Sequence, residues 1–185
     1  GAGRIVFQDL VRIDRAIADG SLGRNAVLNE AFAEAAKPGR RLHLMGLVGH
    51  GGVHATQAHL VALCHLADRA GLKDVFIHAF TDGRDTDPRS GLAAIRELER
   101  DIADTGARIA SLCGRYYAMD RDKRWERVAK AWALLVRGVG DQAPNAAWAL
   151  EESYTKGITD EFLEPCAITG TDGRPVTHIR PGDVV

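Results

Sequence analysis

Three short apolar runs separated by amphipathic stretches constrain the fold of this chain more than any other feature. The runs cover residues 42–48, 75–80 and 108–113, and each leads into a polar turn that contains glycine. Between the runs, apolar residues recur every three or four positions, which predicts helices. Strands that alternate with helices pair in parallel through crossover connections. We therefore expect an α/β fold with three layers, α/β/α, around a mostly parallel central sheet.

The predicted helices follow the three runs in order. The first has its apolar residues on one face and stops at Gly71. The second covers about residues 89–104, and we expect Ser90 or the nearby Asp87 to cap its start. The third covers residues 123–137 and carries an apolar stripe on one face, formed by Trp125, Val128, Trp132 and Leu135.

The two flanks of the chain carry weaker patterns. Residues 4–36 have helical spacing in two stretches, one that includes Ile5 and another that includes Phe32. Near the C-terminus, residues 166–168 and 175–179 flank a Thr-Asp-Gly turn. This pattern predicts a C-terminal segment that resembles a β-hairpin.

Length and composition favour one globular domain over residues 1–185, because a chain of 185 residues with 45% apolar content can bury a solid core. A formal net charge of −1 and a pI near 6.7 argue against a nucleic-acid partner. No apolar run approaches the roughly 20 residues that span a bilayer, and no signal peptide is recognisable. Three widely spaced cysteines fit a reducing compartment. We therefore expect a cytoplasmic protein with no nucleic-acid or membrane partner.

Ionisable side chains collect where the three predicted strands end. The turns cover residues 49–54, 81–85 and 114–122. In an open α/β sheet, ligands bind just beyond the carboxyl ends of the strands. Because three such turns share that edge, we expect their side chains to form one site.

The residue types in these turns predict a small anionic ligand. Arg84, Arg115 and Arg121 offer forked donors that match carboxylate or phosphate oxygens. Asp85 and His54 are suited to handling hydroxyl protons, because a carboxylate beside guanidinium groups stays ionised and can act as a base. Together they describe a pocket for a hydroxy acid.

Other interpretations of the same residues stay open at this point. A loop arginine is most often a solvated surface charge. Asp82 and Asp85 are common turn formers, and residues 120–124 are typical of a charged helix start. A purely structural domain is therefore an alternative.

Histidines raise the question of a metal site, because three of them follow the first strand: His50, His54 and His59. Their spacing matches neither the HExxH helix nor a CxxC site, so we predict no metal site in this chain and keep a zinc hydrolase only as an alternative. His43, His65 and His78 lie in apolar or helical contexts, and we expect them to be packed or on the surface.

Three motifs together resemble one enzyme family. They are the Gly-Gly-Val-His of residues 51–54, the Asp-Gly-Arg-Asp of residues 82–85 and the long block of residues 114–125. All three look like the signature blocks of cofactor-independent phosphoglycerate mutase. The resemblance runs over nearly the whole chain, and further matching segments are residues 1–4, 8–10, 152–154 and 160–162.

The resemblance implies an isomerase that interconverts 3-phosphoglycerate and 2-phosphoglycerate in glycolysis and gluconeogenesis. It implies a phosphatase-like domain with two manganese ions and a serine nucleophile, and an inserted domain that holds the glycerate. The phosphoryl group moves to the serine, the glycerate reorients, and the group returns to the other hydroxyl. Residues 1–185 would correspond to the inserted domain, and the phosphatase-like domain would lie outside this chain.

Carried over by motif, the resemblance also implies roles for individual residues. The arginines would hold the carboxylate, Asp85 would be the catalytic residue that shuttles a proton, and His54 would orient the other end of the glycerate. The substrate-binding set is thus His54, Arg84, Asp85, Arg115 and Arg121. No cofactor is expected within the chain itself.

The sequence departs from the family pattern on both sides of His54. Gly49 and His50 stand where the family usually has Ser-Asp, and Ala55 and Thr56 stand where it usually has Ser-His. These changes alter the hydrogen-bonding neighbours of His54, on which the tautomer and orientation of an imidazole depend.

The expected partners follow from the same resemblance. They are the small-molecule substrate and the phosphatase-like domain of a monomeric enzyme. Because phosphoryl transfer depends on metal and positioned charge, we expect the isolated chain to be inactive. The main alternative function is a stand-alone module that binds small hydroxy or phospho acids.

Overall fold

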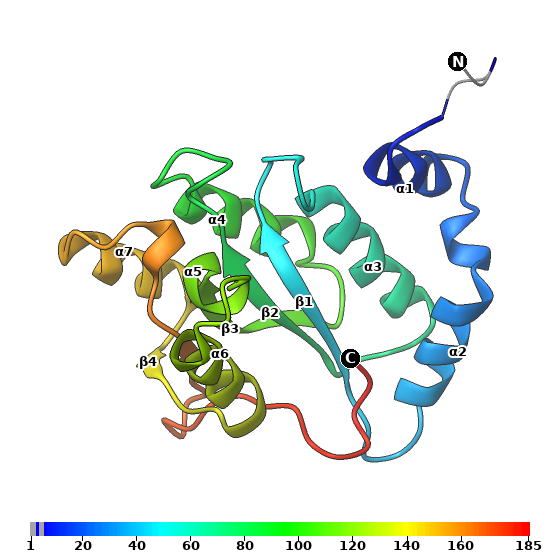
Figure 1. Ribbon diagram of the computed structural model, residues 1–185. Coiled ribbons are helices and arrows are strands. Elements are labelled where there is room, and N and C mark those ends of the chain that lie inside the picture. Colours follow the sequence, from blue (N-terminus) through cyan, green and yellow to red (C-terminus); the bar gives the residue numbers. More distant parts are fainter. Residues whose placement is uncertain (1–2, 4–5) are drawn as a thin grey trace.

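The computed structural model describes residue 3 and residues 6–185, which form a central sheet with helices on both faces (Figure 1). The sheet has the strand order β1-β2-β3-β5-β4. β3 and β5 pair antiparallel, and the other neighbours pair parallel. The α/β fold with a mostly parallel sheet is therefore confirmed. The strands are β1 (Leu42–Val48), β2 (Val75–Thr81), β3 (Ala107–Gly114), β4 (Asp141–Ala143) and β5 (Cys166–Ile168).

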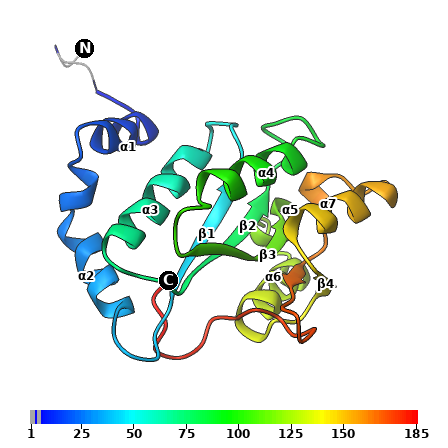
Figure 2. The same cartoon turned by 180° about the vertical axis from the view of Figure 1, so that it is seen from behind.

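Two sets of helices cover the sheet, and Figures 1 and 2 show them from opposite sides. One face packs against α3 (Gln57–Arg69), α4 (Gly91–Asp101) and α7 (Ala146–Thr155). The other packs against α5 (Arg115–Ala118) and α6 (Trp125–Arg137). In the described part of the chain, no helix combines the length and apolar character that crossing a membrane requires.

Two further helices lie beside α3, away from the sheet centre (Figure 2). They are α1 (Asp9–Ala18) and α2 (Ala26–Ala35), joined through the short turn η1 (Leu22–Arg24). Phe32 of α2 is buried against Ala67 of α3. The helical pattern predicted for residues 4–36 is confirmed from residue 9 onward. Ile5, and residues 1, 2 and 4 of the predicted N-terminal match, lie outside the described residues.

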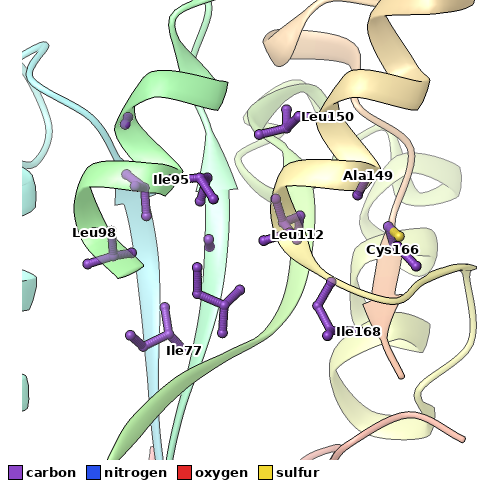
Figure 3. Packing of buried hydrophobic residues seen from close by; sticks show 14 of the residues in the cluster. Ile77, Ile95, Leu98, Leu112, Ala149, Leu150, Cys166 and Ile168 are labelled. Carbon is purple, nitrogen blue, oxygen red and sulfur yellow. The ribbon is translucent and has the colours of Figure 1, made fainter. Parts of the chain in front are cut away.

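The main core fills the layer between the sheet and the helices α3, α4 and α7 (Figure 3). Ile77 and Leu112 come from the strands, and Ile95, Leu98 and Leu150 come from the helices; all five are fully buried. Burying an aliphatic side chain of this size contributes about 1.5–3 kcal/mol. Parallel strands covered on both faces read as continuous apolar runs, which is why these strands could be predicted.

Helix α6 is present where the sequence predicts it, but its apolar stripe is not its buried face. Trp125 is 69% exposed and Trp132 is 47% exposed. Ala131 and Leu134 make the contact with the core instead. The small Ala131 lets the helix approach the sheet closely, and the Trp132 ring lies outside under the guanidinium of Arg137.

The C-terminal hairpin-like segment is present in a short form. Thr169 and Pro175 form an antiparallel bridge, and the Gly170 N–H donates to the carbonyl of Arg174. The Val176 N–H still donates to the Ile168 carbonyl, but beyond Val176 the chain no longer forms a second arm of the hairpin. It turns away and runs back to the start of β1, where Val184 bridges Leu42 in parallel.

A chain of buried polar groups, which we call the polar latch, ties this C-terminal segment to three neighbouring strands. His78 Nδ1 lies 2.7 Å from Ser111 Oγ, and His78 Nε2 lies 2.9 Å from His43 Nδ1. His43 Nε2 lies 3.1 Å from Asp183 Oδ2, which also pairs with Arg41 Nη2 at 2.6 Å. The latch thus consists of Arg41, His43, His78, Ser111 and Asp183, and both histidines are packed as expected.

Candidate functional site

The carboxyl ends of β1, β2 and β3 meet at a cavity of about 270 Å³. Its lining includes all five residues that the sequence singles out: His54, Arg84, Asp85, Arg115 and Arg121. The prediction that the three turns form one site is therefore confirmed as geometry. What these side chains bind stays a prediction.

A larger groove of about 490 Å³ lies between α1, α2 and α3. Its lining includes the apolar residues Phe32 and Leu66, and its charged lining residues are Arg24 and Arg69. It contains no carboxylate and no imidazole among its lining residues, so it offers nothing to accept or donate a proton near neutral pH. The strand-end cavity has both kinds of group, and we therefore take it as the candidate site.

Arg115 lines the cavity and pairs with two aspartates, of which Asp85 also lines the cavity. Arg115 Nη1 lies 2.6 Å from Asp85 Oδ2 and 2.7 Å from Asp82 Oδ1, and the Arg115 side chain is only 10% exposed. Burial alone would lower the pKa of Arg115, but its hydrogen bonds to Asp85 and Asp82 raise it above the ordinary value. Arg115 is thus a permanent cation that fixes the position of Asp85.

Asp82 organises the turn after β2. Its Oδ1 accepts hydrogen bonds from the backbone N–H groups of Arg84 and Asp85 at 3.2 and 3.0 Å. Burial acts to raise the pKa of Asp82, but these hydrogen bonds and Arg115 outweigh it, so the pKa is lowered. The interpretation of Asp82 as a turn former is therefore correct.

His54 faces Asp85 from the turn after β1. Its Nε2 lies 3.7 Å from Asp85 Oδ2, and the side chain is about half exposed. This separation is too long for a direct hydrogen bond. Asp85 therefore lies between a fixed cation, Arg115, and an imidazole that is still free to contact a ligand.

Arg84 and Arg121 are the more accessible arginines of the cavity. Arg84 is 60% exposed on its side chain, and its nearest carboxylate is Glu161, with 3.7 Å between Nη1 and Oε1. Arg121 is exposed and makes no ion pair with the described residues. A ligand anion can reach these two guanidinium groups without breaking a short ion pair, in contrast to Arg115.

The short helix η2 (Asp160–Phe162) packs directly against two of the three loops that form the cavity, those after β2 and β3. A Cβ atom on Gly83 would lie 2.8 Å from the backbone nitrogen of Glu161. One on Gly114 would lie 2.3 Å from the Glu161 carbonyl oxygen. Glycine at both positions therefore lets the turns after β2 and β3 rest directly on η2.

Asp160 joins this support to the start of α4. It is fully buried, and it accepts hydrogen bonds from the Gly91 N–H at 2.7 Å and from the Tyr154 hydroxyl. Burial raises the pKa of Asp160 above its ordinary value. Ser90 is the N-cap residue of α4, as predicted, but neither its side chain nor that of Asp87 makes a capping hydrogen bond. The N–H of Gly91 instead donates to Asp160, which lies 69 residues further along the chain.

The three histidines considered for zinc do not converge. His50 Nε2 contacts Glu97 of α4 at 2.8 Å, and His59 Nε2 contacts Asp14 of α1 at 2.7 Å. His54 faces the cavity instead. No group of three or more His, Cys, Asp or Glu side chains in the described residues is placed to hold a metal ion. The zinc-hydrolase alternative has no support from this arrangement.

Six residues line the cavity besides the five that the sequence singles out, and three of these six carry charges that bear on the shape of the cavity. Glu161 comes from η2, Asp120 from the loop after α5, and Arg127 from the first turns of α6. Asp120 belongs to the third predicted turn and also fits the alternative of a charged helix start, because its Oδ2 accepts a hydrogen bond from the Arg124 N–H at 2.8 Å. No local signal marks Arg127, because its approach to the cavity depends on how the chain reverses between α5 and α6.

Known proteins resemble this chain over its full length. A family model described as the N-terminus of BPG-independent PGAM matches residues 13–185. The 2,3-bisphosphoglycerate-independent phosphoglycerate mutases of Thermomicrobium roseum and Bacteroides thetaiotaomicron are 53% and 49% identical to it, over 100% of this chain. In a crystal structure of Leishmania mexicana phosphoglycerate mutase at low cobalt concentration, the matching part has a TM-score of 0.91 and 30% identity over 99% of this chain.

The chain matches only part of each of these proteins. It spans 36% of the length of the two bacterial relatives and 35% of the Leishmania chain. The family model nevertheless covers nearly all residues of this chain. The chain therefore belongs to the BPG-independent phosphoglycerate mutase family and corresponds to the N-terminal part that the family model describes.

Proposed function

We propose that this chain is the substrate-binding domain of a phosphoglycerate mutase that interconverts 3-phosphoglycerate and 2-phosphoglycerate. Residues 1–185 bind and reorient the glycerate, while a serine of a second, phosphatase-like domain outside this chain carries the phosphoryl group. Such an intermediate splits one transfer into two covalent steps. The observation that carries the proposal is the single cavity lined by all five side chains that the family motifs single out.

In this proposal Arg84 and Arg121 bind the acid group of the glycerate. Both are accessible, and a planar guanidinium matches the two oxygens of a carboxylate. Arg115 adds a permanent positive charge beneath them. Its Nη1 is already shared between Asp82 and Asp85, so its part is to attract the anion and to hold Asp85.

Asp85 is the residue that we assign to proton transfer. Arg115 fixes one of its oxygens, and a carboxylate beside a guanidinium group can act as a base. It takes the proton of the glycerate hydroxyl that attacks the phosphoryl group. In the opposite half-reaction it returns that proton to the oxygen that leaves the phosphoryl group. His54, 3.7 Å from Asp85, orients the other end of the glycerate.

The two manganese ions implied by the family resemblance belong, in this proposal, to the second domain. The described residues of this chain do not provide a fitting set of donors. The roles that we assign to this chain are therefore binding the glycerate and moving its proton. We further propose that the whole enzyme is a cytoplasmic monomer that acts in glycolysis and gluconeogenesis, with the phosphatase-like domain as the partner of this one.

An NMR titration of this chain with D-3-phosphoglycerate and D-glycerate tests the proposal. We expect a dissociation constant of about 1 mM, or about −4 kcal/mol, because domain closure normally completes such a site. Backbone shifts should cluster on His54, Asp85 and the neighbouring arginines. Arg24 and Arg69 in the larger groove serve as internal controls. Shifts in that groove without shifts in the cavity would contradict the proposal.

A stand-alone module for small hydroxy or phospho acids is the second candidate. The observation that favours this candidate is the lining of the cavity, because its guanidinium, imidazole and carboxylate groups are sufficient to bind such an acid without a further domain. The gene sequence flanking residues 1 and 185 distinguishes the two candidates. A reading frame that continues into Asp- and His-rich metal-binding motifs excludes the stand-alone module, whereas its absence excludes the mutase domain.

A further inference from the structure

Helix α6 brings a fourth arginine, Arg127, into the cavity. Its guanidinium carbon lies 3.7 Å from the centre of the Tyr116 ring. Its Nη1 lies 3.6 Å from Oδ1 of Asp120, and its side chain is 22% exposed. A stacked guanidinium beside a carboxylate has little freedom to rotate. Arg127 is therefore held in one orientation at the wall of the cavity.

The carboxylate that lies beside Arg127, Asp120, is buried and has one oxygen without a hydrogen-bond partner among the described residues. Its side chain is only 1% exposed, and Oδ2 accepts backbone hydrogen bonds from Arg124 and Asp122. Its other oxygen, Oδ1, has no hydrogen-bond partner among the described residues. A buried carboxylate oxygen without a donor is costly, so it favours a nearby cation strongly. Arg127 is the cation that the structure places within 4 Å of it.

Arg127 also differs from Arg115 in what it can still offer to a ligand. Arg115 Nη1 is shared between two aspartates at hydrogen-bond distance. Arg127 makes no hydrogen bond of normal length with the described side chains, because its contact with Asp120 is 3.6 Å. Its forked donors therefore remain available to a carboxylate in the cavity. The Tyr116 ring that supports it is itself backed by Phe162, at 5.1 Å between ring centres.

We infer that Arg127 is a further substrate-binding residue, which contacts the carboxylate of the glycerate, and that Asp120 is its positioning residue. This inference rests on the proposed function, because it names an additional contact in the same pocket. We assign Asp120 no contact with the ligand, because its side chain is only 1% exposed and its free oxygen is buried. It acts by keeping the guanidinium over Tyr116.

Titration of Arg127→Met with D-glycerate, which has a carboxylate and no phosphate, tests the contact. We expect the dissociation constant to rise about tenfold or more, as for the loss of a charge-assisted hydrogen bond. The matched control is Arg137→Met. Arg137 lies on the same helix and stacks on Trp132 at 4.8 Å, outside the cavity, so its replacement should leave the affinity unchanged.

The test of Asp120 requires a measurement that does not change when the variant merely lowers the stability of the domain. The NMR signal of the Arg127 Nε–H group reports how tightly the guanidinium is held. In Asp120→Asn we expect this signal to broaden and glycerate binding to weaken about threefold, while the Arg137 signal stays unchanged. An Arg127 signal as sharp as in the unmodified protein would show that Asp120 does not position it.

The outcomes separate this inference from the proposed function. An unchanged affinity in Arg127→Met, with ligand shifts still at His54 and Asp85, removes Arg127 from the site and leaves the proposed function intact. Loss of D-3-phosphoglycerate binding with unchanged D-glycerate binding overturns the carboxylate contact. Absence of binding by the unmodified chain overturns both. If Arg127→Met does not fold, Arg127→Lys keeps the charge but loses the fork, and unchanged glycerate affinity there also overturns the inference.

Discussion

Asp85 and Asp82 bind the same nitrogen of Arg115, yet they are suited to different tasks. Asp82 is 8% exposed on its side chain and is held by the backbone of its own turn. Asp85 is 25% exposed and faces His54. A ligand can therefore reach Asp85, whereas Asp82 serves the geometry of the loop. Of these two acids on one turn, Asp82 thus has a structural role and Asp85 is placed for a chemical one.

Gly114 is the residue at which we expect the smallest possible substitution to be harmful. A Cβ atom there would lie 2.3 Å from the Glu161 carbonyl oxygen and 2.7 Å from the Leu163 nitrogen. Backbone atoms cannot rotate aside as the tip of a side chain can, so β3 or η2 must shift. We expect Gly114→Ala to lower the free energy of unfolding by about 2–4 kcal/mol, measured by urea denaturation.

Gly46 in β1 provides the matched control for Gly114. No described atom lies within 4 Å of a Cβ atom built on it, and its backbone does not adopt a positive φ. We expect Gly46→Ala to change the free energy of unfolding by less than about 1 kcal/mol. Equal losses in the two variants would show that the contact with η2 is not the cause.

The candidate site could be predicted in part at this scale. The strand-end turns are local in sequence, so His54, Arg84 and Asp85 could be placed together from the pattern alone. Glu161 could not, because η2 reaches the cavity through contacts between residues far apart in the sequence. Arg127 could not either, since helical periodicity does not say which face of α6 meets the loop after α5.

At the scale of elements, the three strands with strong apolar character could be predicted as members of the sheet, whereas the place of the two short strands in it could not. The predicted runs agree with β1, β2 and β3 to within one residue at either end. β4 has only three residues, which is too short for a pattern to stand out. β5 coincides with the predicted segment 166–168, but its pairing with β3 and β4 joins residues far apart in the sequence, which a local pattern does not show. The buried face predicted for α6 was wrong for a different reason. Its tryptophans are large apolar side chains, but they lie at the surface of the folded domain.

The polar latch predicts how stability depends on pH. Burial lowers the pKa of His78 to about 3 and also lowers that of His43, whereas an unfolded histidine titrates near 6.5. Between these values the unfolded chain binds more protons, so stability is lost as the pH falls below about 6.5. From pH 7 to pH 4.5 we expect the free energy of unfolding to fall by about 2–3 kcal/mol in urea denaturation.

Asp183 adds to this loss only at lower pH. Burial acts to raise its pKa, but hydrogen bonds from Arg41 and from the Arg180 N–H outweigh it, so the pKa is lowered. Its contribution is therefore lost only below about pH 4. His78→Gln should flatten the dependence between pH 7 and 4.5, whereas His65→Gln on α3 should not. A slope that is unchanged in His78→Gln would assign it to groups other than His78.

At the scale of the whole molecule, the candidate site and the polar latch lie at different positions along the strands. The cavity lies beyond the carboxyl ends of β1 to β3, and the latch joins the first residues of β1 to the C-terminal segment. Figure 1 shows the label for the C-terminus near the start of β1, away from the loops that form the cavity. Changes in the latch should therefore alter stability more than ligand affinity.

The proposed division of labour predicts that this chain does not turn over substrate by itself. It spans 36% of the length of its bacterial relatives, and its described residues offer no metal-binding group. In an enolase-coupled assay with added Mn²⁺ and 3-phosphoglycerate, we expect no product above background. A full-length relative serves as the positive control, and turnover by the chain alone would contradict the proposed function.

The contact between His43 and Asp183 joins residues 140 positions apart, and this has a consequence for the order of folding during synthesis. A ribosome adds about 5–20 residues per second, so about 7–28 seconds pass between the making of these two residues. During that interval β1 to β3 can pair, but His43 lacks the Asp183 carboxylate that its Nε2 contacts in the complete fold. The contacts of β1 with residues 183 and 184 can therefore form only after these residues have been synthesised.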